Sequence, residues 1–300
     1  MSKYNFLLPA FKSPFLKEAL LSLQAQTFRD FSVIISDDCS PEPLFEIVHP
    51  FLSDPRFSYR KNESNIGGKH LVSHWNLLLA DCHSPYLIVA GDDDLYEPTF
   101  LEEMDKLISR FPEVDLFRSR MELIDSTGKG IRTENSFKSF EESSTFVQAL
   151  FDSTHLHAVG QFVFKTEILK RLGGFKDFPL AWFSDDATAI LCSKNGVVHS
   201  SDVLFHFRVS DYNISGQKGS PYLDRLKGKA TILFYRWFST CYKGRMTRKP
   251  CRDYCCSILR KIWSNFSVIL KFETLLTFPI LGYRLMRSRL RRIIDWCLCK

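Results

Sequence analysis

The sequence contains no internal repeat, no low-complexity segment and no uninterrupted apolar run long enough to cross a membrane. Its most apolar C-terminal stretch, residues 263–283, is interrupted by Lys271, Glu273 and Pro279. These absences argue against a repeat protein and against a membrane-spanning one. Hydrophobic residues make up 45% and charged residues 25% of the 300 residues, as in a folded globular protein with a large core.

Paired cysteines of the CxxC type are also missing. The nine cysteines are an odd number, and six of them follow residue 240. The N-terminal apolar run is short and closed by Pro9, which does not match a secretory signal. We therefore expect reduced thiols and a cytoplasmic protein rather than a disulfide framework.

Charge is distributed unevenly along the chain. Residues 225–300 contain 18 Lys and Arg against 3 Asp and Glu, a net charge of +15, whereas the remainder carries −9. Residues 284–296 mix Arg with Leu, Ile and Trp, a pattern typical of an amphipathic helix on an anionic membrane surface. We expect a basic helical extension over 216–300, peripheral on the inner face of the cytoplasmic membrane, and no nucleic-acid partner. A solvated helical face is the alternative.

Short apolar strands alternate with helical segments over the first 120 residues. Strands are expected at 4–8, 31–36, 56–60, 86–90 and 114–118, with helical segments between them. This alternation predicts right-handed βαβ units around a mainly parallel sheet, hence an α/β fold. Residues 120–145 are polar and suit a loop or hairpin, and a last strand is expected at 203–209.

Acidic residues follow two of these strands. Asp37 and Asp38 follow the second strand, and Asp92, Asp93 and Asp94 follow the fourth. Ligands of parallel α/β sheets bind beyond the carboxyl ends of the strands. Adjacent carboxylates repel one another unless a cation lies among them, and Mg²⁺ or Mn²⁺ prefers oxygen ligands. The run at 92–94 therefore predicts a divalent metal; a turn that caps the next helix is the alternative.

Two further segments are candidates for chemistry. Asn65 and Gly67 belong to a turn whose backbone N–H groups can face a phosphate, with Lys69 beside it. Asp185 and Asp186 stand at the start of a predicted helix, where a carboxylate can act as a general base or simply cap the helix after Ser184.

A series of motifs resembles the family 2 glycosyltransferases, bacterial-type enzymes with a nucleotide-diphospho-sugar-binding GT-A fold. In order, the motifs are 7–11 (LLPAF), 26–31 (QTFRDF), 33–40 (VIISDDCS), 65–68 (NIGG), 74–76 (HWN), 91–98 (GDDDLYEP), 173–175 (GGF) and 184–186 (SDD). Each motif is weak alone, but their order is specific. The resemblance covers about residues 1–215.

The resemblance implies an inverting transfer of a sugar from a nucleotide-diphosphate sugar to a glycan or lipid-linked glycan. The donor it suggests is a UDP-sugar, the cofactor Mn²⁺ or Mg²⁺, and the setting surface polysaccharide biosynthesis. Residues 1–120 then form the nucleotide-sugar-binding half and 120–215 the acceptor-binding half of one domain.

Residue roles follow from the resemblance by position. The residues implied for the nucleoside pocket are Pro9, Ala10, Phe11 and Asp37, with Asp38 nearby. Those implied beside the ribose and diphosphate are Asn65, Gly67, Lys69, Asp92, Asp93 and Arg208. Asp92 and Asp94 are the expected metal ligands, and Asp186 is the expected base, with Asp185 as the alternative.

Two positions depart from the family pattern. Gly91 stands where many relatives carry the first Asp of an Asp-Ser-Asp-Asp run, and Asp185 replaces the usual Glu. These departures leave open which two carboxylates of 92–94 hold the metal, and which of Asp185 and Asp186 is the base.

Three other interpretations explain less of the sequence. A nicotinamide-binding enzyme requires Gly-x-Gly-x-x-Gly after the first strand, where this chain has residues 9–12 (PAFK). A metal-dependent phosphotransferase accounts for acidic clusters but not for Asp37 or the Gly-Gly-Phe motif. A catalytically inactive sugar-nucleotide binder would not need Asp186 together with the three carboxylates.

Overall fold

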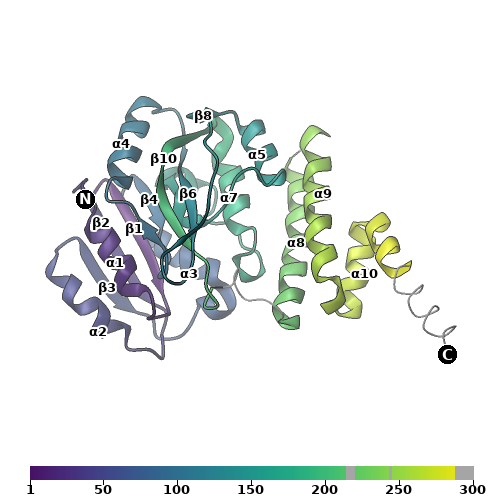
Figure 1. Ribbon diagram of the computed structural model, residues 1–300, viewed down its shortest axis with the longest axis horizontal. Coiled ribbons are helices and arrows are strands. Elements are labelled where there is room, and N and C mark those ends of the chain that lie inside the picture. The colour runs from purple at the N-terminus through teal and green to yellow at the C-terminus, as the bar shows by residue number, and fades with distance from the viewer. Residues whose placement is uncertain (214–219, 243–244, 288–300) are drawn as a thin grey trace. The chain divides into compact units, whose positions relative to one another are not determined.

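The computed structural model describes residues 1–213, 220–242 and 245–287, except for the side chains of Lys69 and of residues 245–248. The chain divides into two compact units (Figure 1). The first consists of Met1–Asp177 and Ser184–Gln217, and the second of Phe178–Phe183 and Lys218–Lys300.

The first unit is built on a ten-stranded sheet with the order β3-β2-β1-β4-β9-β6-β10-β5, in which β7 pairs with β6 and β8 with β10. The strands are β1 (Tyr4–Ala10), β2 (Phe31–Asp37), β3 (Phe57–Lys61), β4 (Tyr86–Val89), β5 (Leu95–Tyr96), β6 (Leu116–Ile124), β7 (Gly130–Thr133), β8 (Phe140–Glu141), β9 (Phe162–Lys165) and β10 (Val197–Arg208). The long pairings β1–β2, β2–β3, β1–β4 and β6–β10 are parallel. The predicted α/β fold with a mainly parallel sheet is confirmed.

Helices cover both faces of the sheet in this unit. They are α1 (Leu16–Gln24), α2 (Leu44–Val48), α3 (Gly67–Asp81), α4 (Phe100–Arg110), α5 (Ser143–Phe151), α6 (Thr166–Arg171) and α7 (Ser184–Cys192). Apolar residues of α1, α2 and α4 share one core with Phe6 and Leu8 of β1. Leu7 points to the opposite face because side chains alternate along a strand, and α3 contacts β1 there.

The hairpin that the sequence allowed after residue 120 is confirmed, because strand β6 continues to Ile124 and returns antiparallel through β7. Strand β10 begins at Val197, six residues earlier than predicted. The extension of β6 beyond residue 118 begins with Ser119 and Arg120, so it lacks the apolar alternation that marks a strand. Arg118 and Ser119 are nevertheless completely buried.

The second unit is helical, as predicted for the C-terminal extension. It contains α8 (Pro221–Cys241), α9 (Arg245–Ile262) and α10 (Val268–Thr277). Ser220 caps α8 and Ser267 caps α10, each accepting a hydrogen bond from a backbone N–H of the first turn. The ring of Phe183 stacks on Phe234 of α8 at 4.5 Å. Within the described ranges, no helix has the length and apolar character needed to span a bilayer. Most of the amphipathic segment predicted at 284–296 lies outside the described residues.

Candidate functional site

The carboxyl ends of β1 and β2 lie level with one another. Ala10 is paired with Asp37, and the N–H of Asp38 donates to the carbonyl of Ala10 at 2.9 Å. The segment after β1 is also tied to the loop after β4, because Asp92 Oδ2 accepts the backbone N–H groups of Phe11 and Lys12, both at 2.9 Å. The structure thus brings the predicted residues Pro9, Ala10 and Phe11 next to Asp37 on one side and Asp92 on the other.

The carboxylates of 92–94 form a buried acidic loop at this edge. Burial, and then the neighbouring Asp92, raises the pKa of Asp93 to about 6. The pKa of Asp94 is raised well above its ordinary value by burial and by Asp93. Such shifts mean that the ionised loop is short of positive charge.

Lys12 supplies part of that charge, and sequence analysis did not identify it. Its ammonium lies 3.5 Å from Asp93 Oδ2 and 3.6 Å from Asp92 Oδ1. Burial lowers the pKa of Lys12, but attraction to Asp92 and Asp93 outweighs it and the net shift is upward. The only signal in the sequence is a lysine two residues beyond the first strand.

The acidic loop suits a hard divalent cation that shares its ligands with a substrate. In the described part of the chain, its carboxylates do not place three ligand atoms within 4.8 Å of one another. Mg²⁺ sites commonly use one or two carboxylates and complete their shell with substrate phosphates and water, which this loop allows. The Lys12 ammonium is shared by Asp92 and Asp93, whereas Asp94 Oδ1 accepts the backbone N–H of Arg208 at 3.0 Å.

Close packing explains why the acidic loop is preceded by a glycine, Gly91. A Cβ atom at Gly91 would lie 2.7 Å from Asp94 Oδ2 and 3.0 Å from Asp93 Oδ1. Any side chain there would displace carboxylates that are already crowded and buried. The close packing of the acidic loop therefore accounts for a glycine at this position, where many relatives carry an aspartate.

Asp37 lies at the end of β2 among several donors. It accepts a hydrogen bond from the backbone N–H of Ser40 and another from the Tyr59 hydroxyl, both at 2.7 Å. Lys61 lies 3.6 Å from it. The Asp37 side chain is thus fixed in place by β3 and by the turn that follows β2.

Asp38 organises the turn before α3. It accepts the backbone N–H groups of Ile66 at 2.9 Å and Gly67 at 2.6 Å. Asn65 accepts the N–H of Gly68 at 2.6 Å. The N–H groups predicted to face a phosphate therefore already bind side chains of the same chain. The side chain of Lys69 is outside the described part of the structure.

Arg208 is completely buried and holds the acidic loop in place. Its Nε donates to the carbonyl of Asp93 at 2.9 Å, and Nη2 binds Glu18 at 2.7 Å. Nη1 faces the carbonyls of Asp125 and Ser126, and the guanidinium lies 4.3 Å from the centre of the Phe15 ring. Every guanidinium nitrogen thus has a partner within the protein, so a direct contact with a diphosphate would require one of these bonds to be exchanged.

Asp185 and Asp186 occupy the first turn of α7. The backbone before them is strained, with positive φ at Leu180, Ala181 and Phe183, a feature that concentrates at functional sites. Burial raises the pKa of Asp185 to about 6, and burial together with Asp185 raises that of Asp186 well above its ordinary value.

The partner of Asp186 is a histidine that sequence analysis missed. Asp186 Oδ1 lies 3.6 Å from His157 Nδ1 without a hydrogen bond, and the Asp186 side chain is 14% exposed. Burial, and then Arg118 and His155, lowers the pKa of His157 well below its ordinary value. Nothing in the irregular sequence around His157 marks it. Among the described residues, no hydrogen bond or ion pair joins Asp185 or Asp186 to the acidic loop.

Comparison with known proteins identifies the family to which this chain belongs. The profile of Glycosyl transferase family 2 matches residues 6–173, more than half of the chain. A protein of Methanocaldococcus jannaschii described as an uncharacterized glycosyltransferase is 26% identical over 233 residues, which are 77% of this chain and 76% of that protein.

Solved structures share the fold at low sequence identity. TarS of S. aureus (residues 1–349, in complex with UDP-GlcNAc) has a TM-score of 0.62 and 14% identity, over 95% of this chain and 92% of that one. The mannosyltransferase PcManGT of Pyrobaculum calidifontis, in complex with GDP-Man and Mn²⁺, has a TM-score of 0.61 and 14% identity, over 97% and 80%. The fold is the GT-A fold, and the chain belongs to glycosyl transferase family 2 and is a glycosyltransferase.

Proposed function

We propose that this enzyme transfers a sugar, with inversion, from a nucleotide-diphosphate sugar to a hydroxyl of a glycan or lipid-linked glycan in surface polysaccharide biosynthesis. The observation that carries the proposal is the buried acidic loop 92–94, hydrogen-bonded to the end of β1 at the edge where α/β sheets bind ligands. The nucleotide sugars in the complexes of TarS and PcManGT support this donor class. A UDP-sugar is our proposed donor.

The donor would lie across the ends of β1, β2 and β4. Pro9, Ala10, Phe11 and Asp37 form the nucleoside pocket, because the two strands end level with each other. Asp92 and Asp94 would hold Mn²⁺ or Mg²⁺, with Asp93 beside them. When bound, this ion supplies positive charge for the diphosphate leaving group. Lys12, whose ammonium lies 3.6 Å from Asp92 and 3.5 Å from Asp93, would contact a phosphate of the donor.

Asp186 is proposed as the general base. Its carboxylate takes the proton of the acceptor hydroxyl while the oxygen bonds to the anomeric carbon and the bond from that carbon to the diphosphate breaks. A raised pKa makes a carboxylate a better proton acceptor, provided that it is ionised at the working pH. Asp185, one residue earlier, is the alternative base.

The C-terminal extension is proposed to rest on an anionic membrane surface. Helix α10 exposes apolar side chains at helical spacing, namely Val268, Ile269, Phe272 and Leu276. Ile280 and Tyr283 are also exposed, on the helical residues after the break at Phe278. Residues 225–300 carry a net charge of +15, and an apolar face beside basic residues is the usual composition of a helix at a lipid interface. Such a placement would bring a lipid-linked acceptor to the enzyme.

A ligand panel tests the proposal. Thermal shift should show stabilisation by UDP with Mn²⁺, and none by NAD. Hydrolysis of a panel of nucleotide sugars with and without Mn²⁺ should then identify the donor. Stabilisation by NAD alone, or release of phosphate from a nucleotide without release of sugar, would overturn the proposed reaction.

A further inference from the structure

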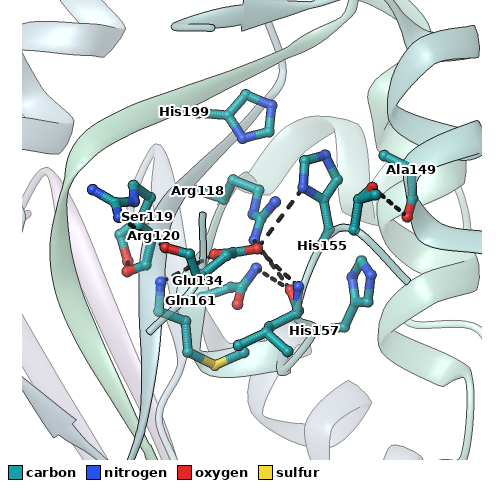
Figure 2. A network of polar contacts seen from close by, with 12 residues as sticks. Arg118, Ser119, Arg120, Glu134, Ala149, His155, His157, Gln161 and His199 are labelled. Atoms are coloured by element: carbon teal, nitrogen blue, oxygen red, sulfur yellow. Dashed lines mark hydrogen bonds and ion pairs between the residues drawn. The ribbon is translucent and has the colours of Figure 1, made fainter. Parts of the chain in front are cut away.

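A second group of potential metal ligands lies away from the acidic loop. It consists of Glu141 on β8, His155 after α5 and His199 on β10, whose ligand atoms all lie within 4.8 Å of one another. Figure 2 shows His155 and His199 beside the buried pair of Arg118 and Glu134. Both histidines are buried, and Glu141 is mostly so.

The fold brings these three residues together from separate segments. Strands β8 and β10 are antiparallel with Glu141 opposite Val197, so Glu141 and His199 are diagonal neighbours on paired strands. Helix α5 leads from Glu141 to His155, where Ser153 turns the chain with a positive φ. The two ends of this helical segment therefore meet at one point on β10.

Only one of the two imidazole contacts in this group is a hydrogen bond. His155 Nε2 hydrogen-bonds to Glu141 Oε2 at 2.9 Å, and His199 Nε2 lies 3.1 Å from the same oxygen. His199 Nε2 is buried and forms no hydrogen bond despite this short distance. With both nitrogens close to one carboxylate oxygen and all three atoms within 4.8 Å of one another, the group has room for one ion with bonds of about 2 Å.

The other nitrogen of His155 is also consistent with a ligand. Its Nδ1 is buried without a hydrogen-bond partner and lies 3.8 Å from Glu134 Oε1. Glu134 is held by Arg118 at 2.6 Å and by the backbone N–H of Leu156 at 2.8 Å. A metal-bound histidine commonly faces a fixed carboxylate with its second nitrogen, because this orients the ring and raises its basicity.

We infer that Glu141, His155 and His199 bind a transition-metal ion, most favourably Zn²⁺, at a site separate from the acidic loop. Two imidazoles and one carboxylate suit Zn²⁺ rather than Mg²⁺, which prefers oxygen ligands alone. Three protein ligands leave a fourth position for water. The ion would fasten the segment from β8 to His155 onto β10, and thereby fix His157, which lies against Asp186.

Metal titration of the full chain tests this inference. After treatment with a chelator, the protein should take up one equivalent of Zn²⁺, measured by elemental analysis, with a rise in melting temperature. Co²⁺ should give the visible spectrum of a four- or five-coordinate ion without a thiolate charge-transfer band, because no cysteine takes part. A cobalt spectrum of six-coordinate type, a thiolate band, or no uptake would overturn the inference.

Variants assign the ligands. Glu141→Gln and His199→Gln should lose this uptake, whereas His83→Gln, at an exposed histidine, should keep it. Glu134→Gln should weaken zinc binding by about 10- to 100-fold, as second-sphere changes do. Asp94→Asn should retain zinc binding even if it loses donor binding. Full zinc binding by the Glu141 and His199 variants would contradict the assignment, and if either fails to fold, the cobalt spectrum of the wild type decides.

Discussion

The side-chain amide of Asn76 accepts a hydrogen bond from the backbone N–H of Phe175 at 2.7 Å and donates one to its carbonyl at 3.2 Å. These residues belong to two motifs separated by almost a hundred positions. The Trp75 ring also meets the Phe175 ring edge to face at 5.5 Å. Gly174, with φ of +91°, has no room for a Cβ beside the Asn76 amide. The pair thus fastens the Gly-Gly-Phe turn to α3.

Asn76→Ala should therefore destabilise the fold. The substitution leaves the Phe175 N–H without its acceptor, which costs about 1–3 kcal/mol of unfolding free energy. Chemical denaturation measures the change, and Ser73→Ala, at an exposed position of the same helix, is the matched control. Equal stability of both variants would show that the amide contributes nothing.

The Arg208→Ala variant should have a lower unfolding free energy than the wild type, even without ligand. Its buried guanidinium binds the exposed Glu18 and donates to the Asp93 carbonyl, and leaving a buried carbonyl without its donor costs about 1–3 kcal/mol. A lower melting temperature of the ligand-free protein is expected, together with weaker binding of Mn²⁺ and UDP. If the ligand-free melting temperature stays unchanged and only UDP affinity falls, Arg208 contacts the diphosphate directly.

Asp93→Asn should stabilise the ligand-free protein at neutral pH while it weakens metal-dependent nucleotide binding. Burial and Asp92 raise the pKa of Asp93 from 3.8 to about 6. Between these pH values the Asp93 carboxyl is protonated in the folded state and ionised in the unfolded state. The contribution of Asp93 to the unfolding free energy therefore decreases as pH rises between these two values. The variant lacks this contribution, whereas Asp94, whose pKa is also raised, keeps its own. Melting temperatures from pH 4 to pH 7 test it, and a variant less stable than wild type at pH 7 would contradict the charge balance described for the loop.

Asp186→Asn should lower kcat for sugar transfer by about 10²- to 10⁴-fold or more and leave UDP binding intact. The base must be ionised, so kcat should fall on the acidic side at a higher pH than an ordinary aspartate would give. Asp185 contributes to the raised pKa of Asp186, so Asp185→Asn should move this acidic limb to lower pH. A normal rate in Asp186→Asn, with Asp185→Asn inactive, would transfer the base role to Asp185.

Ile269→Glu and Phe272→Glu should weaken binding to vesicles that contain anionic lipid. Both side chains are exposed on α10, so the change removes apolar surface and adds repulsive charge without disturbing the core. Co-sedimentation with anionic and with neutral vesicles measures the effect. Lys271→Gln, on the same helix, is a milder control that removes one charge only. Unchanged sedimentation of both glutamate variants would remove the membrane proposal.

Much of this protein is determined locally by its sequence. The alternation of apolar strands and helices, the helical C-terminal extension and the acidic residues after β2 and β4 follow from periods of two and 3.6 residues and from the rule that parallel strands end at one edge. The Asp-rich loop could be placed at that edge because its neighbours along the chain identify the strand before it.

Only the tertiary structure decided which groups those residues face. The deciding contacts join separate segments of the chain. Lys12 lies between Asp92 and Asp93, Arg208 donates to the Asp93 carbonyl, and Glu141 lies beside His155 and His199. The extension of β6 was missed for the same reason, because Arg120 is held by the carbonyls of Ser201 and Glu134, which belong to other segments. A buried charge or imidazole is stabilised by a partner, and the partner depends on how the strands pair rather than on the residues beside it.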